Sequence, residues 1–286
     1  MPDARTIRDA FDRAAASYDR HAALEQEVCR RLLERCEFQR QPPRRILDLG
    51  CGTGQGSEAL KRKYRKSQVI GLDFSFAMLG FLRRRSSLLR PVRPVCGDMS
   101  MLPFAHGSMD LVFSNLAQHL STDPVALFDE IRRVLRPGGL LLFATLGPGS
   151  LAGLREAWAA VDGSVAAWPL PDLMEIGDAL VAAGFREPVM DMERITLHYP
   201  DPDALAHELE GTGASLLLDG WEGWKSERQR LAKALSARLL EGRFPVTYEV
   251  IYGTAFGPPE GQPRKTPDGD VATFSPDSLL KSRTMG

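Results

Sequence analysis

Cysteine and histidine are scarce in this chain of 286 residues, which contains four cysteines and five histidines. No two cysteines form a Cys-x-x-Cys pair, and none stands at metal-ligand spacing from a histidine. The pattern argues against a disulfide-stapled scaffold and against a zinc site. We expect Cys29, Cys36, Cys51 and Cys96 to be reduced thiols of a cytoplasmic protein without a bound metal.

An excess of charge of one sign is also missing, and so are long apolar runs. The formal net charge is −1, so the composition does not indicate bulk binding to nucleic acid or to a membrane surface. No apolar stretch approaches the roughly 20 residues that a membrane span needs. The first residues, "MPDARTIRDAFDRAAASYD", include acids and lack the apolar core of a signal peptide. We therefore expect a soluble, cytoplasmic protein with no nucleic-acid or membrane partner.

What the chain does contain is an alternation of short apolar runs and longer helical patterns. Such an alternation is typical of a parallel sheet that is buried on both faces. It predicts a doubly wound α/β fold with right-handed crossovers. The expected strands cover 45–50, 67–73, 92–98, 108–115 and 140–146, and the expected helices between them cover 57–66, 75–89 and 124–136.

The flanking segments add helices on both sides of this alternation. One or two helices are expected within 5–40, and further elements follow residue 150: helices at 150–161, 172–183, 202–211 and 225–241, and strands at 189–199 and 246–256. We expect one domain over 1–257, with an N-terminal helical cap over 1–42 and a helical insertion over 200–242. The polar, Pro/Gly-rich tail over 258–286 is expected to be extended or disordered.

The stretch "ILDLGCGTGQG" (46–56) places glycine at every second position behind an apolar run and an aspartate. Glycine permits left-handed turns and lets a ligand approach the main chain closely. After the first strand of a doubly wound sheet, such a loop binds a dinucleotide or S-adenosylmethionine. Asp48 stands at the strand end, where a carboxylate repels a pyrophosphate but attracts the ammonium group of a methionine moiety. The loop therefore favours S-adenosylmethionine.

Acidic residues also end the next two expected strands. Asp73 follows the loop by about 20 residues, where a carboxylate can accept hydrogen bonds from ribose hydroxyls. Asp98 can accept a hydrogen bond from the amino group of the adenine. Met99 would then pack on the adenine ring, and Asn115 would line the pocket. A single aspartate after a strand is more often a turn or cap residue. Because ligands bind outside the carboxyl ends of such strands, acids at three successive strand ends favour a cofactor site.

Four segments, "LDLGCGTGQG", "GLDFS", "GDMSMLPF" and "LRPGGLLLFAT", resemble the motif series of class I S-adenosylmethionine-dependent methyltransferases. The resemblance implies a Rossmann-like, seven-stranded sheet whose last strand, near 246–256, runs antiparallel. It assigns cofactor binding to Asp48, Gly50, Cys51, Gly52, Gly54, Asp73, Phe74, Asp98, Met99 and Asn115.

A narrower resemblance extends over nearly all of residues 8–257. The segments "FDRAAASYDRHAALEQEV", "TLGPGSLAGLREAWAAVD" and "FPVTYEVIYGTAFGP" are similar to malonyl-carrier-protein O-methyltransferases of biotin synthesis. This similarity implies methylation of the free carboxylate of a malonyl thioester, held on an acyl carrier protein or on coenzyme A. It further implies that Arg155 orients this carboxylate and that Tyr18 closes the site.

The chain departs from this family on the expected acceptor side. Leu120 stands where the family usually has an aromatic residue, and the stretch over 216–227 replaces a more regular segment that contains Arg and Gly. Three alternatives therefore stay open: a methyltransferase that acts on another carboxylate or on carbon, an arginine-modifying assembly factor of the mitochondrial complex I type, and a scaffold that has lost turnover.

His119 and the run Arg83–Arg85 each have a structural and a functional interpretation. A carboxylate acceptor is ionised at neutral pH and needs no general base, so we interpret His119 as a pocket-lining or capping residue. The arginine run Arg83–Arg85 is interpreted as a solvated helix face, with docking of an acidic carrier protein as the alternative.

Overall fold

The structure is a computed structural model, which describes residues 3–38, 41–121, 123–162, 169–218, 230, 233, 239, 242–261, 264–266 and 269–271. Nearly all of the helix expected over 225–241 and most of the tail expected over 258–286 lie outside the described residues.

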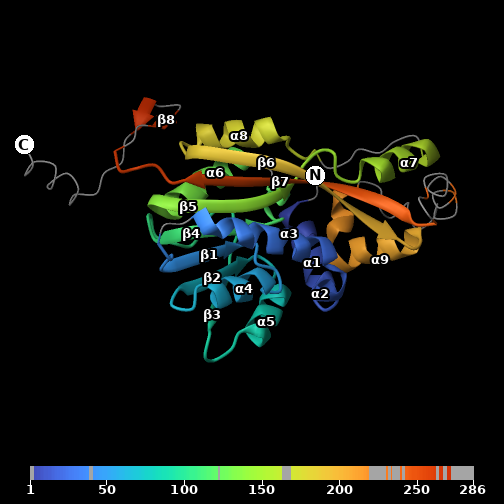
Figure 1. The fold of residues 1–286 in the computed structure, drawn as a ribbon, viewed down its shortest axis with the longest axis horizontal. Coiled ribbons are helices and arrows are strands. Elements are labelled where there is room, and N and C mark those ends of the chain that lie inside the picture. Colours follow the sequence, from blue (N-terminus) through green and yellow to red (C-terminus); the bar gives the residue numbers. More distant parts are fainter. Residues whose placement is uncertain are drawn as a thin grey trace, which may run out of the picture.

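A seven-stranded sheet with the order β3-β2-β1-β4-β5-β7-β6 forms the centre of the molecule (Figure 1). Its strands are Arg45–Leu49 (β1), Gln68–Asp73 (β2), Val92–Cys96 (β3), Met109–Asn115 (β4), Leu135–Leu146 (β5), Arg186–Tyr199 (β6) and Phe244–Phe256 (β7). β1 is parallel to β2 and β4, whereas β7 is antiparallel to both of its neighbours, β5 and β6. The predicted doubly wound fold and the antiparallel last strand are both confirmed.

Helices cover both faces of this sheet (Figure 1). They are Ala4–Ala14 (α1), Tyr18–His21 (α2), Ala23–Glu34 (α3), Gln55–Lys63 (α4), Phe76–Arg85 (α5), Pro124–Val134 (α6), Ala152–Asp162 (α7), Leu173–Ala182 (α8) and Pro202–Thr212 (α9), with short 3-10 turns at Arg35–Phe38 (η1), Gln118–Leu120 (η2) and Ala214–Leu217 (η3). Phe128 of α6 and Leu180 of α8 belong to the core on one face. Leu32 of α3, Leu60 of α4 and Leu82 of α5 belong to the core on the other face. Each such buried side chain contributes about 1.5–3 kcal/mol to folding.

Two of the predicted helices end earlier than expected. The helix expected over 124–136 ends at Val134, because Pro137 lacks the N–H that a helix needs and Gly138 has a φ of 69°. The helix expected over 75–89 ends at Arg85, and Ser86 is extended, with ψ at 121°. Beyond it, Leu88 and Leu89 are almost fully exposed, so no packing favours another helical turn.

The N-terminal helices lie beside α9, although about 190 residues separate them in the sequence (Figure 1). Ser17 Oγ donates a hydrogen bond of 3.4 Å to the Gly211 carbonyl. A Cβ atom at Gly211 would lie 2.5 Å from Cδ2 of His21, so only glycine allows the two helices to approach this closely.

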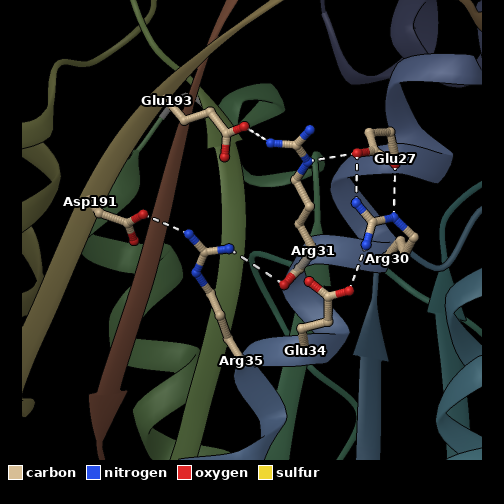
Figure 2. A network of polar contacts seen from close by, with 7 residues as sticks. All are labelled: Glu27, Arg30, Arg31, Glu34, Arg35, Asp191 and Glu193. Carbon is tan, nitrogen blue, oxygen red and sulfur yellow. Dashed lines mark hydrogen bonds and ion pairs between the residues drawn. The ribbon is translucent and has the colours of Figure 1, made fainter.

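A network of charged residues fixes α3 against β6 (Figure 2). Arg35 donates to Asp191 at 2.6 Å, and its guanidinium lies 3.8 Å from the ring centre of Tyr252. Arg31 pairs with Glu193 on the same strand. Exposed ion pairs contribute less than about 1 kcal/mol each, so the main effect of the network is to hold α3 in position. Its other members are Glu27, Arg30 and Glu34, which pair along α3.

The described part of the expected tail contains a small hairpin, in which β8 (Arg264–Thr266) pairs antiparallel with β9 (Gly269–Val271). Within the ranges that the structure describes, no helix has the length and apolar character to cross a bilayer.

Candidate active site

The glycine loop leaves β1 through three residues with positive φ. Gly50, Gly52 and Gly54 have φ angles of 70°, 52° and 87°. The N–H groups of Gly50 and Cys51 both donate to the Leu72 carbonyl, at 2.9 and 3.0 Å. A Cβ atom at position 50 would lie 2.3 Å from Cβ of Ala117, so glycine is required there for steric reasons as well. The loop therefore presents bare main chain at the carboxyl end of β1.

Three cavities have lining residues in common, and two of them border this loop. The first, the strand-end cavity, is lined by predicted residues that include Gly50, Gly52, Asp73, Phe74, Asp98, Met99 and Asn115. The second, the loop cavity, is lined by residues that include Asp48, Cys51, Cys29 and Glu25. The structure thus brings together nine of the ten residues predicted to bind a cofactor. The tenth, Gly54, is the N-cap residue of α4 and lines none of the three cavities.

Asp73 and Asp48 are buried and carry raised pKa values. Burial raises the pKa of Asp73 to about 6, although the carboxylate accepts hydrogen bonds from the N–H groups of Gly52 at 2.9 Å and Ser75 at 2.8 Å. Burial also raises the pKa of Asp48 to about 7, against the effect of the Ser57 hydroxyl, which donates to it at 2.6 Å. No basic side chain of the described ranges pairs with either carboxylate. Both carboxyls therefore lack a positive partner among the described residues, and a positively charged ligand would stabilise their ionised forms.

The third cavity, the helical cavity, lies between the N-terminal helices, α9 and β7. Its lining includes Glu25, His119, Glu208 and Tyr248. Burial lowers the pKa of His119 to about 4, so the imidazole is neutral at physiological pH, and its Nδ1 atom has no hydrogen-bond partner among the described residues. Burial raises the pKa of Glu208, whose carboxylate accepts a hydrogen bond of 2.5 Å from Tyr199.

Tyr18 lines all three cavities and therefore stands where they meet. Burial raises its pKa well above the usual range, so the phenol keeps its proton. Leu116 and Leu120 line both the strand-end and the helical cavity. Leu116 has a φ of 50°, a left-handed conformation that costs leucine roughly 1–2 kcal/mol. Strained residues of this kind cluster at functional sites.

The surroundings of Arg155 and of the run Arg83–Arg85 differ from those expected. Arg155 lines none of the three cavities, and its guanidinium donates to the Pro148 carbonyl at 2.6 Å. Arg85 pairs with Asp19 of α2 and, at 3.4 Å, with Glu58 of α4. The interpretation of the whole run as a solvated face is therefore wrong for Arg85. Arg83 and Arg84 are exposed, and each lies over an aromatic ring of its own helix.

Sequence reasoning missed three acids that organise the site. Asp19 accepts hydrogen bonds from Thr53 at 2.5 Å and from Gln55 at 2.8 Å, so it ties α2 to the glycine loop. Asp12 accepts from Ser75 at 2.5 Å and ties α1 to the start of α5. Glu25 lies on the wall between the loop cavity and the helical cavity. The quoted segment that contains "SYD" pointed to this region without indicating these contacts.

The fold and the strand-end site together define a class I methyltransferase. Residues 47–143 match the protein family described as Methyltransferase domain. Phosphoethanolamine N-methyltransferase 2 from Haemonchus contortus, solved with S-adenosylhomocysteine, shares the fold with a TM-score of 0.52. It is 23% identical to the chain, and the match covers 80% of this chain and 52% of that one.

Two relatives are similar over almost their whole length. The malonyl-[acyl-carrier protein] O-methyltransferase of Laribacter hongkongensis is 42% identical over 96% of this chain and 96% of its own. That of Gallionella capsiferriformans is 43% identical over 93% of this chain and 94% of its own. The chain belongs to the malonyl-[acyl-carrier protein] O-methyltransferase family.

Proposed function

We propose that the protein transfers a methyl group from S-adenosylmethionine to the free carboxylate of a malonyl group carried by acyl carrier protein or by coenzyme A. Two lines of support carry this proposal. The first is the family membership over nearly the full chain. The second is the junction of three cavities at Tyr18, because methyl transfer needs donor and acceptor to meet in line at one point.

The residues of the strand-end and loop cavities fit the donor. The donor supplies a methyl group on a positively charged sulfur and carries an ammonium group. Buried acids without a basic partner suit a cationic ligand, which would lower their raised pKa values. We assign Asp73 to the ribose, Asp98 and Met99 to the adenine, and Asp48 to the charge of the methionine moiety. The side-chain oxygen of Asn115 is buried and has no hydrogen-bond partner in the described chain, so it can accept a hydrogen bond from the ligand.

We assign the acceptor to the helical cavity. A malonyl carboxylate is already ionised at neutral pH, so no residue has to remove a proton from it. The neutral His119 and the phenol of Tyr18 can donate hydrogen bonds there and exclude water. We do not assign Arg155 to the acceptor, as the resemblance implies, because its guanidinium donates to the Pro148 carbonyl and would have to leave it to reach an acceptor.

The direct test is to incubate the protein with malonyl-acyl carrier protein and S-adenosylmethionine labelled in the methyl group. We expect a labelled methyl ester that mild alkali hydrolyses, and the same product, more slowly, from malonyl-coenzyme A. Acetyl-acyl carrier protein, which has no free carboxylate, is the matched control and should take no label. Labelling of a different carboxylate or of carbon would establish the alternative methyltransferase.

A second measurement separates binding from turnover. Calorimetry should show binding of S-adenosylhomocysteine to the wild type, and Asp73→Ala should weaken it by about 1.5–3 kcal/mol, the value of a charge-assisted hydrogen bond. Binding without any methylation would favour the non-catalytic scaffold. Absence of binding would refute the cofactor assignment itself.

A further inference from the structure

The helical cavity has no fixed positive charge among its described lining residues. Its polar side chains are those of Tyr18, Glu25, His119, Glu208, Thr212 and Tyr248. None is a lysine or an arginine, and the histidine is neutral at physiological pH. A carboxylate in this cavity must therefore be held by neutral hydrogen-bond donors of the described chain.

The two carboxyl groups of the cavity differ in their surroundings. Glu208 accepts the hydrogen bond from Tyr199, which favours its charged form. Glu25 receives no hydrogen bond from another side chain of the described ranges, and the charge that acts on its carboxyl is that of Glu208. Glu25 lines both the helical cavity and the loop cavity, and its carboxyl is close enough to Tyr18 and Tyr248 for its charge to raise their pKa values.

We propose that Glu25 binds the methyl acceptor, its carboxyl carrying a proton and donating a hydrogen bond to the acceptor carboxylate. This inference rests on the proposed function. A hydrogen bond from a carboxylic acid to a carboxylate is charge-assisted and about twice as strong as a neutral one. During transfer, an acceptor oxygen forms its bond to the methyl carbon while the sulfur–carbon bond breaks, and Glu25 keeps its proton. The ester accepts a weaker hydrogen bond, which favours its release.

The groups that face Glu25 all favour this protonation state or are neutral. Burial, together with the charge of Glu208, raises the pKa of Glu25 to about 7, against the effect of a backbone hydrogen bond. The facing groups are Tyr18 of α2, Cys29 of α3, Asp48 of β1, His119 of η2, Glu208 of α9 and Tyr248 of β7. The tyrosines and the thiol have raised pKa values and stay neutral. The negative charge of the bound acceptor carboxylate also raises the pKa of Glu25, so binding of the acceptor is accompanied by proton uptake near pH 7.

The experiment measures KM for malonyl-acyl carrier protein between pH 6.5 and pH 8 in wild type, Glu25→Gln and Glu25→Ala. Wild-type KM should rise roughly eightfold over this range, because a group with a pKa near 7 loses its proton. Glu25→Gln keeps a neutral donor, so its KM should stay constant and lie within about threefold of the wild-type value at pH 6.5. Glu25→Ala lacks the donor, so its KM should be independent of pH and lie roughly tenfold or more above the wild-type value at pH 6.5. Glu27→Gln is the matched control, since Glu27 lies on the same helix but pairs with Arg30 at the surface.

Proton uptake gives a second readout that a structural role would not change. Calorimetry of malonyl-coenzyme A binding to the S-adenosylhomocysteine complex, in buffers of different ionisation enthalpy, should show uptake of about half a proton at pH 7. Glu25→Gln should abolish this uptake and leave S-adenosylhomocysteine affinity unchanged.

Three results would overturn the inference. They are a Glu25→Gln variant as impaired as Glu25→Ala at pH 6.5, a pH dependence that disappears in Glu208→Gln instead, and a loss of S-adenosylhomocysteine affinity in Glu25→Gln. The last result would assign Glu25 to the cofactor. A wild-type enzyme that forms no ester at all refutes the proposed function and is distinguished from these outcomes by the wild-type measurement alone.

Discussion

Arg85 of α5 and Asp19 of α2 form an ion pair that connects the N-terminal helices to the wall of the cofactor site. Asp19 also accepts hydrogen bonds from Thr53 and Gln55, at the end of the glycine loop and the start of α4. The same helix, α2, begins with Tyr18. The ion pair therefore positions the residue at which the three cavities meet.

Removing this ion pair should weaken cofactor binding. The pair is partly exposed, so Arg85→Ala should raise the dissociation constant of S-adenosylhomocysteine by roughly two- to fivefold. Arg83→Ala is the control, because Arg83 is exposed on the same helix and lies over Phe76 without an ion pair to α2 in the described structure. Calorimetry on both variants checks the prediction. Equal affinities for wild type and Arg85→Ala would show that α2 is held by its other contacts.

The buried acids should make the cofactor-free protein less stable as the pH rises. The folded protein holds the proton of Asp48 with a pKa of about 7, whereas an unfolded aspartate titrates near 3.9. The folded state thus binds more protons, so stability is lost as the pH rises through about 7. Between about pH 6.5 and pH 8 the loss from Asp48 should be about 1 kcal/mol.

Urea unfolding at these two pH values tests this sign. Asp48→Asn should reduce the slope, and saturation with S-adenosylmethionine should reduce it in the wild type. Below about pH 6.5 His119 acts in the opposite direction, because its folded pKa of about 4 means that stability is lost as the unfolded histidine takes up a proton. A wild type that is more stable at the higher pH would contradict the assignment of buried, uncompensated acids.

The turnover rate at saturating acceptor should be almost independent of pH between about 6.5 and 8.5, because no base has to titrate. His119→Ala should keep most of this rate, since the imidazole is neutral over the whole range. The pH dependence that we infer for Glu25 affects KM and not kcat. A limb of the kcat profile near pH 7 that disappears in His119→Ala would assign His119 as a general base.

Arg155→Ala should leave cofactor affinity unchanged and raise KM for the malonyl substrate by no more than about threefold. The reason is that the guanidinium binds the Pro148 carbonyl and lines none of the three cavities. Arg155→Lys, which keeps the positive charge, should have the same small effect as Arg155→Ala. A rise in KM of more than about tenfold in both variants would instead support the role that the resemblance implies, since lysine lacks the planar pair of donors that matches a carboxylate.

The sequence predicted the sheet well, and the reason is physical. β1 and β4 are buried on both faces, so most of their residues are apolar and do not alternate with polar ones, and parallel strands of this kind place their carboxyl ends at one edge. This is why Asp48, Asp73 and Asn115 could be assigned together. The ends of helices were less predictable. The end of α5, for example, depends on whether Leu88 and Leu89 pack against the core, and in the structure both are exposed.

The contacts that close the site could not be read from local patterns. Asp19 and Glu25 belong to helices rich in charged residues, in which an acid at the surface and an acid in a cavity look alike in the sequence. Their roles follow from where α2 and α3 pack, which depends on segments far away in the chain. The left-handed backbone of Leu116 likewise has no signal in its own residue type.

The position of β7 has a consequence for how the chain is made. β7 lies between β5 and β6, although it is the last of the seven strands to leave the ribosome. Until residues 244–256 have emerged, the 14-residue β6 has no neighbour in the sheet, and its backbone could pair with strands of other chains. The exposed charged residues along it, Arg186, Glu187, Asp191 and Arg194, oppose such pairing. Asp191 thus has two effects: its charge opposes pairing of β6 with other chains before β7 has emerged, and in the folded chain it forms the ion pair with Arg35.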